Sequence, residues 1–247
     1  MELSVDLSTQ AIILLAITAL FNGISKTGIP GLGIVFVVLV PLAIPAKVST
    51  GYILPFLIFG DIMAVTYWRR SAVWRYILAV LPAMLVGIII GYFIMDRISD
   101  VAYGRVLGGV VLFLILLDWA RRYFGIPVPK DSRVLSYSIG LMAGILTMMA
   151  NAAGPVVMLY LLAMNISKEE FVGTSAWIYF IINLFKVPFS MSLGLITFGS
   201  LQVNFMLLPF VIVGGILGVK VMRRLPLKTF ENIMRVLAVL GGIKLLF

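Results

Sequence analysis

The sequence contains no cysteine and no histidine, and only 12% of its 247 residues are charged. The missing residue types exclude disulfide bonds, thiol catalysis and metal sites built from histidine or cysteine. They also leave aspartate and glutamate as the only side chains suited to carrying a proton near neutral pH. Hydrophobic residues make up 62% of the chain, against about 45 to 50% in a soluble domain. The composition, with a mean hydropathy of +1.15, therefore indicates a membrane protein.

Several long stretches are apolar on every face, among them LAVLPAMLVGIIIGYFIM (78–95) and GGVVLFLILL (108–117). No helical period could hide one side of such a stretch from water, so we expect lipid around it. The first ten residues, MELSVDLSTQ, are acidic and lack the basic region of a cleaved signal. We therefore expect a polytopic protein whose first apolar stretch remains in the mature chain.

The net charge of +9 comes from short basic loops, which are typical of cytoplasmic loops and do not indicate a nucleic-acid partner. The opposing loops carry few basic residues. If all the basic loops lie in the cytoplasm, both termini lie on the outer side of the membrane. We expect that membrane to be the cytoplasmic membrane of a cell. The three basic groups are Arg69, Arg70 and Arg75; Arg121, Arg122, Lys130 and Arg133; and Arg223, Arg224 and Lys228.

Ten apolar segments follow one another along the chain. Two of them, 31–44 and 152–165, are shorter than the about 20 residues that a helix needs to cross a bilayer. Each begins at a Gly/Pro break, so we interpret them as half-helices that enter the membrane without crossing it, facing protein or a water-filled cavity. The other segments are 11–28, 49–67, 75–95, 104–120, 134–150, 171–190, 203–222 and 231–247.

The chain contains an internal repeat. LPAMLVGIIIGYFIMDR (81–97) aligns with LPFVIVGGILGVKVMRR (208–224), and VSTG (48–51) aligns with VGTS (172–175). The repeat divides the chain into two halves, 1–120 and 134–247, joined by a polar linker at 121–133. About five segments per half is an odd number, so the second half should be inverted. The sequence thus predicts an all-α polytopic membrane protein of two inverted repeats, with paired broken or re-entrant helices at the repeat interface, as in secondary transporters.

Several motifs resemble those of the sulfite exporter TauE/SafE family of membrane transporters, also called the toluene-sulfonate uptake permease family. They are GISKTGIPGLGIVFVVLVPLAIPAKVSTGY (23–52), MMANAAGPVVMLYLLAMNISKEEFVGTSAW (148–177), the YWRR that closes the third segment, and the LP…G…G…R element of each half. The likeness covers essentially the whole chain, although both loops depart from the commoner GxGGG pattern. The resemblance implies passage of small sulfur-containing oxyanions, sulfite or organosulfonates, across the cytoplasmic membrane.

Lys26 is the first candidate substrate-binding residue, because an ionisable group inside the bilayer is costly and marks a functional site by default. Its ammonium and the N–H groups of a helix start would suit an oxyanion. Gly28 and Gly31, with Gly33, would let the backbone approach the anion, and Pro30 fits the first turn of the next half-helix. Alternatively, Lys26 lies nearer the interface or pairs structurally with Asp61.

Asn151 falls opposite Lys26 in the repeat, since Pro30 and Pro155 are 125 residues apart. Its amide could donate to an anion or cap the half-helix that starts at Gly154 and Pro155. Gly154 is therefore a further candidate for the binding site.

Asp61 and Lys186 occupy matching places in the third and eighth segments, again 125 residues apart. We expect Lys186 to be a second cationic contact for the substrate. Asp61 would be its counter-charge and the residue that couples transport to protons; a purely structural ion pair is the alternative.

Thr50 and Thr174, with Ser49 and Ser175, lie at the starts of the third and eighth segments. Their hydroxyls could bind an oxyanion, and helix capping explains them as well.

Together these features predict a secondary transporter that works by alternating access, with a passive anion channel as the alternative. GISKTGIPG lacks the G-x-x-x-x-G-K-[ST] spacing of a nucleotide-binding loop, so we expect no ATP drive within this chain. We expect neither a cofactor nor a metal. Enzyme activity on a membrane substrate is disfavoured because too few acid, base or nucleophilic groups lie deep in the apolar segments.

Overall fold

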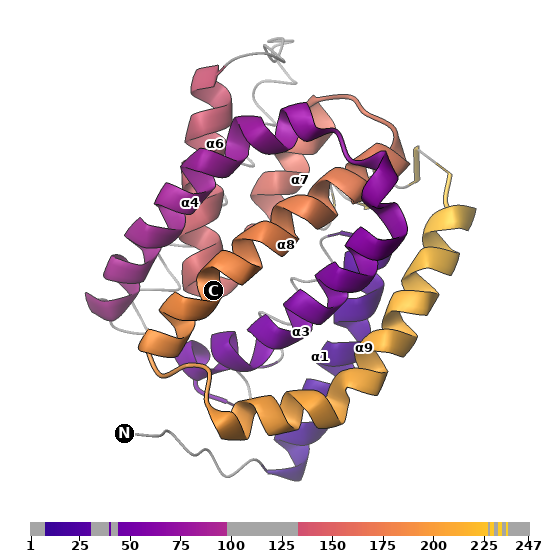
Figure 1. The fold of residues 1–247 in the computed structure, drawn as a ribbon. Helices are drawn as coiled ribbons and strands as arrows, with labels where there is room; N and C mark the ends of the chain where they lie inside the picture. Colours follow the sequence, from indigo (N-terminus) through magenta and orange to yellow (C-terminus); the bar gives the residue numbers. More distant parts are fainter. Residues whose placement is uncertain are drawn as a thin grey trace.

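The computed structural model describes residues 8–30, 40, 44–97, 133–226, 228–229, 232–233 and 236. Within them the chain forms seven α-helices, one 3-10 turn and no β-strand (Figure 1). The elements are α1 (Thr9–Thr27), α3 (Ala46–Trp68), the 3-10 turn η2 (Arg69–Ser71), α4 (Trp74–Arg97), α6 (Arg133–Ala150), α7 (Gly154–Ala163), α8 (Lys168–Ser192) and α9 (Phe198–Arg224).

Six of these helices, all except α7, are long and apolar enough to cross a membrane. Each overlaps one of the long predicted segments, so the prediction of an all-α polytopic membrane protein is confirmed. The predicted segments 31–44, 104–120 and 231–247, and the linker 121–133, lie wholly or largely outside the described residues. Helix α7 has 10 residues, which corresponds to about 15 Å, half of a bilayer core of about 30 Å.

Helix α3 is held between α1 and α9 by two buried asparagines. Asn22 of α1 donates a side-chain hydrogen bond to the carbonyl of Phe56, and Asn204 of α9 donates to the carbonyl of Tyr52. These carbonyls lie on either side of Pro55, where the helix lacks one backbone donor. The asparagines therefore tie the middle of α3 to its two neighbours.

Glycines allow α1 and α9 to pack in close contact. A Cβ atom on Gly23 would overlap the backbone of Val211, and one on Gly28 would overlap the backbone of Gly218. Because these contacts advance in the same direction along both helices, α1 and α9 run parallel. Small residues permit this approach between membrane helices.

The same arrangement joins α4 to α6. A Cβ atom on Gly140 would meet the carbonyl of Val80, and one on Gly144 would overlap the carbonyl of Met84. These helices are also parallel. The first helix of each half of the chain thus packs against the last long helix described for the other half.

Helices α3 and α8 form the centre of the bundle and run antiparallel. Gly51, near the start of α3, lies against Leu195 beyond the end of α8, and Gly173, near the start of α8, lies against Trp68 at the end of α3. Figure 1 shows α4 and α6 on one side of this central pair and α1 and α9 on the other.

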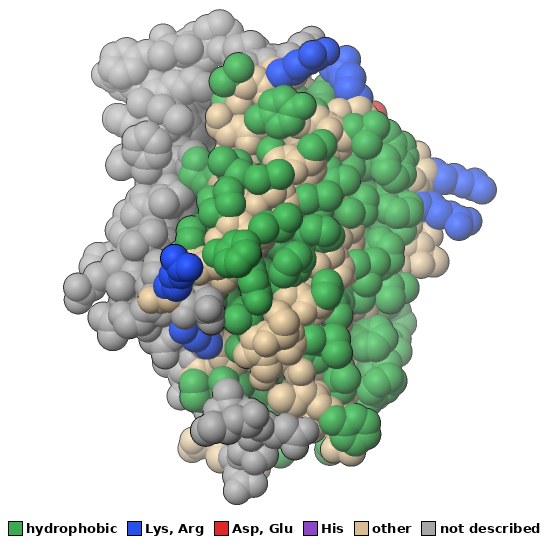
Figure 2. Space-filling view, turned by 60° about the vertical axis from the view of Figure 1, so that its left-hand side comes forward, with side chains coloured by type: hydrophobic (Ala, Val, Ile, Leu, Met, Phe, Trp, Pro, Cys, Tyr) green, Lys and Arg blue, Asp and Glu red, His purple; other side chains and the backbone are tan. Residues whose placement is uncertain are grey.

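The basic residues of several predicted loops lie at one end of the bundle. The indole of Trp68 donates to the carbonyl of Thr27, and Lys168 donates to the carbonyls of Met222 and Leu225. These contacts gather the ends of α1, α3 and α9 with the start of α8. Exposed arginines at this end are Arg69, Arg70, Arg75, Arg223 and Arg224. Figure 2 shows hydrophobic side chains over most of the described face, with Lys and Arg at its margins.

Candidate functional site

A chain of hydrogen-bonded polar side chains passes through the middle of the bundle, and we refer to it as the polar cluster. It links α1, α3, α8, α6 and the break between α6 and α7. Its members, in order of contact, are Lys26, Asp61, Asn183, Lys186, Thr147 and Asn151.

One end of the polar cluster is an ion pair between α1 and α3. The Nζ atom of Lys26 lies 2.7 Å from Oδ1 of Asp61, whose side chain is fully buried, and 4.3 Å from the ring centroid of Tyr179. Gly60 makes room for this lysine, because a Cβ atom there would lie 2.8 Å from Cγ of Lys26. Lys26 is therefore neutralised by a carboxylate and covered by an aromatic ring.

The other end of the polar cluster surrounds Lys186 on α8, which is 1% exposed. Its Nζ atom donates to Oγ1 of Thr147 at 3.3 Å, to Oδ1 of Asn183 at 3.2 Å and to Oδ1 of Asn151. All three acceptors are neutral. Within the described part of the chain, no carboxylate is hydrogen-bonded to or ion-paired with Lys186.

Asn183 connects the two ends. Its side-chain amide donates to Oδ2 of Asp61 at 2.7 Å, while its carbonyl oxygen accepts from Lys186. This geometry corrects the pairing expected from the sequence: the counter-charge of Asp61 is Lys26, and not Lys186. The repeat places Asp61 and Lys186 at equivalent positions, but equivalence under a repeat does not require contact.

Asn151 lies at the break that separates α6 from α7. Its backbone is left-handed, with φ of 54°, and its side-chain amide donates to the carbonyl of Thr50 at 3.2 Å. Of the two alternatives for Asn151, capping of the following half-helix is not observed, because the N-cap of α7 is Ala153 and no described side chain makes a cap hydrogen bond there. Asn151 is turned toward Lys186 instead.

The start of α7 lies three residues beyond Asn151, at Gly154. A Cβ atom on Gly154 would meet no atom of the described residues within 4 Å. An uncapped helix start presents backbone N–H groups and the positive end of the helix dipole, both of which attract anions. Lys186, the Asn151 amide and this helix start therefore lie in one part of the molecule.

The hydroxyl groups that could bind an oxyanion are hydrogen-bonded to backbone groups. Oγ1 of Thr50 donates to the carbonyl of Lys47 at 2.6 Å, and Oγ1 of Thr174 accepts from the backbone N–H of Val73 at 2.9 Å. Oγ of Ser175 donates to the carbonyl of Val172 at 3.0 Å. Neither threonine hydroxyl is hydrogen-bonded to a member of the polar cluster.

The glycines of the first loop divide into two groups. Gly28 ends α1, where its N–H donates to the carbonyl of Ile24, and it is packed against Gly218. Its observed role is close packing of α1 on α9. Gly31 and Gly33 lie outside the described residues.

Two members of the polar cluster, Thr147 and Asn183, were not predicted from the sequence. Asn183 lies three residues before Lys186 on α8, and Thr147 lies four residues before Asn151. Residues at these spacings share one face of a helix. That spacing was the signal available in the sequence.

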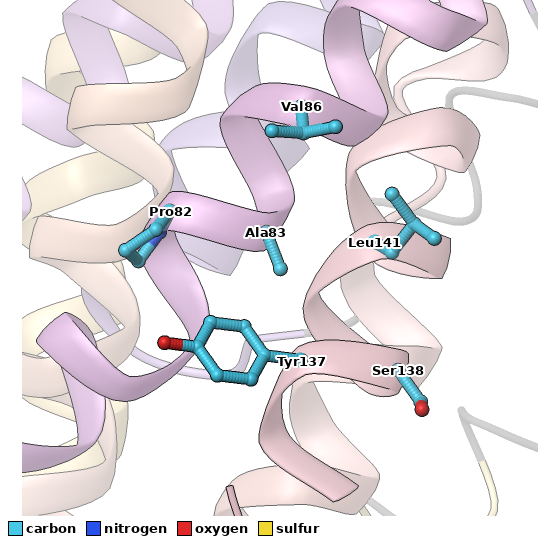
Figure 3. A pocket seen from close by; sticks show the side chains of 6 residues that line it. All are labelled: Pro82, Ala83, Val86, Tyr137, Ser138 and Leu141. Atoms are coloured by element: carbon cyan, nitrogen blue, oxygen red, sulfur yellow. The ribbon is translucent and has the colours of Figure 1, made fainter. Parts of the chain in front are cut away.

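An apolar groove of about 370 Å³ lies elsewhere, between α4 and α6. Figure 3 shows its lining side chains, with Tyr137 and Ser138 as the polar ones. The described lining residues are Pro82, Ala83, Val86, Tyr137, Ser138 and Leu141. None of these six residues is charged, so the polar cluster is the better candidate for an anion site.

The family of this chain is identified by its match to a family model. No curated protein and no solved structure matches the chain. The family model described as Sulfite exporter TauE/SafE matches residues 14–245, which is nearly the whole chain. The resemblance of the two loop motifs extends through all six long apolar helices. This multi-pass membrane protein therefore belongs to the sulfite exporter TauE/SafE family of transporters.

Proposed function

We propose that this protein is a secondary transporter that moves a small sulfur-containing anion, sulfite or an organosulfonate, across the cytoplasmic membrane. The family description supports the substrate class. The observation that carries the proposal is the polar cluster, which places two lysines and one aspartate among apolar helices. Buried charge of this kind is costly in a membrane protein and typically marks the path of a substrate or ion.

The arrangement of helices supports alternating access between two inverted halves, 1–120 and 134–247. Helices α3 and α8 are antiparallel at the centre, and the pairs α1–α9 and α4–α6 each join one half to the other. Helix α7 is short enough to act as a re-entrant half-helix. Rocking of the two halves would expose the polar cluster to each side of the membrane in turn.

The proposed substrate site comprises Lys26, Asn151, Lys186 and the start of α7 at Gly154, as these groups supply positive charge and hydrogen-bond donors. Asp61 is the proposed proton carrier because, in the described residues, it is the carboxylate that belongs to the polar cluster. The sequence also suggested Gly28, Gly31, Thr50 and Thr174 as contacts, but the proposed site does not depend on them.

A passive anion channel would use the same cations, but it needs a continuous open path. Asp61 is 0% exposed and Lys186 is 1% exposed. Such burial favours a transporter, in which the site opens to one side at a time, over an open pore.

The test is transport by the purified protein in liposomes. Sulfite, a panel of sulfonates and a panel of carboxylates are offered with and without a pH gradient. We expect saturable uptake of the sulfur anions that accelerates when unlabelled substrate is present inside. Conductance without saturation or acceleration would identify a channel, and absence of uptake would refute the proposal.

Two variants assign the roles of the charges. Lys26→Ala should abolish uptake of every anion, because Asp61 loses its counter-charge, and Asp61→Asn should remove the dependence on the pH gradient. Lys220→Ala is the matched control, since Lys220 is an exposed lysine on α9. Unchanged uptake by Lys26→Ala would show that the site lies elsewhere.

A further inference from the structure

We propose that the transported anion carries a single negative charge and that it binds Lys186, displacing the neutral oxygens that now hold this lysine. The inference rests on the proposed function and specifies its substrate by charge. Lys26 is then a balancing charge for Asp61, and not the main electrostatic contact of the substrate.

The polar cluster contains three ionisable side chains, those of Lys26, Asp61 and Lys186. Lys26 and Asp61 form an ion pair at 2.7 Å and neutralise one another. In its protonated form, Lys186 adds a positive charge, and within the described residues no carboxylate is hydrogen-bonded to or ion-paired with it. With Lys186 protonated, the described cluster therefore has one positive charge without a direct counter-ion.

Lys186 is held by neutral groups. Its three hydrogen-bond acceptors, on Thr147, Asn151 and Asn183, are neutral oxygens. An anionic acceptor adds a Coulombic attraction to a protonated lysine that a neutral oxygen does not supply. An oxyanion can therefore replace one or two of these acceptors, whereas replacing Asp61 at Lys26 would leave a buried carboxylate without its partner.

Donors for the other oxygens of the anion are available at Asn151 and at the start of α7. Asn151, one of the displaced acceptors, has an amide group that can donate to an anion after rotation. Among the described residues, no atom lies within 4 Å of the Cβ position of Gly154, and the N-cap residue of α7, Ala153, makes no side-chain cap hydrogen bond. These features supply donors for the oxygens of a sulfonate group that do not contact Lys186.

Desolvation limits the net charge of a buried site. Moving an uncompensated charge out of water costs several kcal/mol, so a buried site favours a ligand that brings its net charge to zero. An anion with one negative charge satisfies this condition at the polar cluster. An anion with two negative charges leaves one uncompensated, and a neutral ligand leaves Lys186 uncompensated.

The experiment compares methanesulfonate, which always carries one negative charge, with sulfate, which carries two. Uptake is measured by counterflow in liposomes without a pH gradient, so that loss of proton coupling does not stop transport. We expect wild-type protein to take up methanesulfonate at least about tenfold faster than sulfate. Equal uptake of the two anions would overturn the charge inference while leaving the proposed function intact. Uptake of neither these anions nor sulfite would instead refute the proposed function.

Variants of the polar cluster provide the second readout. Lys186→Met should lower methanesulfonate uptake on the order of a hundredfold. Lys26→Met also removes one positive charge and should lower uptake strongly. Lys26→Met leaves Asp61 and Lys186, whose charges cancel. Adding Asp61→Asn returns the net charge of the polar cluster to one positive charge, carried by Lys186, so this double variant should recover uptake relative to Lys26→Met.

Asp61→Asn alone removes the negative charge of the polar cluster and raises its net charge from one to two. It should therefore shift the preference toward sulfate. Thermal melting and size-exclusion profiles in detergent show whether each variant is folded. If Lys26→Met/Asp61→Asn is unstable, the Lys26→Gln/Asp61→Asn double variant replaces it, because glutamine keeps polar contacts. The inference is overturned if folded Lys186→Met transports methanesulfonate normally. A folded double variant that stays as inactive as Lys26→Met would also overturn it.

Discussion

Two lysines in the middle of this bundle, Lys26 (10% exposed) and Lys186 (1% exposed), have different environments. Lys26 lies 2.7 Å from the carboxylate of Asp61 and beneath the ring of Tyr179. Lys186 contacts only neutral oxygens among the described residues. The contrast shows that a lysine in an apolar helix can be a member of a neutral pair or a source of uncompensated charge. In this protein the α1–α3 side supplies the neutral pair, and the α6–α8 side supplies the charge available to an anion.

The largest expected effect comes from breaking the neutral pair. Asp61→Ala should lower the free energy of unfolding by about 3 to 5 kcal/mol, because it leaves Lys26 buried without a counter-charge. Chemical unfolding in detergent micelles measures this change. A loss below about 1 kcal/mol would mean that water already screens the pair, and the contrast between the two lysines would disappear.

Removing Lys186 should cost less stability. Lys186→Met deletes the charge together with its side-chain hydrogen bonds and leaves three neutral acceptors, so we expect a loss of about 1 to 2 kcal/mol. The same unfolding measurement on both variants gives the comparison directly. If Lys186→Met were more destabilising than Asp61→Ala, Lys186 would have a stronger counter-charge than its neutral acceptors.

Substitutions at Asn151 separate its backbone role from its side-chain role. Asn151→Ala should destabilise the protein by about 1 to 2 kcal/mol, because alanine disfavours the left-handed backbone found here. Asn151→Gly keeps that conformation at little cost and removes the same amide. Both variants should raise the KM for methanesulfonate, measured by uptake. A higher KM for the alanine variant alone would show that only the shape of the break matters.

The smallest expected effect is at Thr174, whose hydroxyl accepts a hydrogen bond from the backbone of Val73. Thr174→Val should cost about 1 kcal/mol of stability and leave the KM for the anion nearly unchanged, while Thr174→Ser retains the acceptor. Melting temperature and uptake are measured on both variants. A raised KM in folded Thr174→Val would show that this hydroxyl binds the substrate, as the sequence suggested.

The helices could be predicted because their signal is strong and local. Helix α4 is apolar from Tyr76 to Met95, and a Gly/Pro break marks the start of the short segment that becomes α7. Lys26, Asp61 and Lys186 could also be identified, because charged residues are conspicuous within apolar runs.

The sequence offered both Lys26 and Lys186 as partners for Asp61, and it could not decide between them. The contact of Asp61 with Lys26 depends on how α3 crosses α1 and α8 and on the reach of each side chain. Neither quantity is encoded by spacing along the chain. Asn183 and Thr147 were missed because neutral polar residues are common in membrane helices, and only their contacts with Lys186 distinguish them.

The most direct test of the central claim is equilibrium binding of radiolabelled methanesulfonate to purified protein in detergent. The Lys26→Met/Asp61→Asn variant keeps Lys186 as its source of positive charge in the polar cluster, and Lys186→Met keeps only the neutral pair. We predict that the double variant binds within about tenfold of the wild-type Kd and that Lys186→Met shows no measurable binding. Binding by Lys186→Met together with loss of binding by the folded double variant would contradict the account, and would assign the substrate to Lys26.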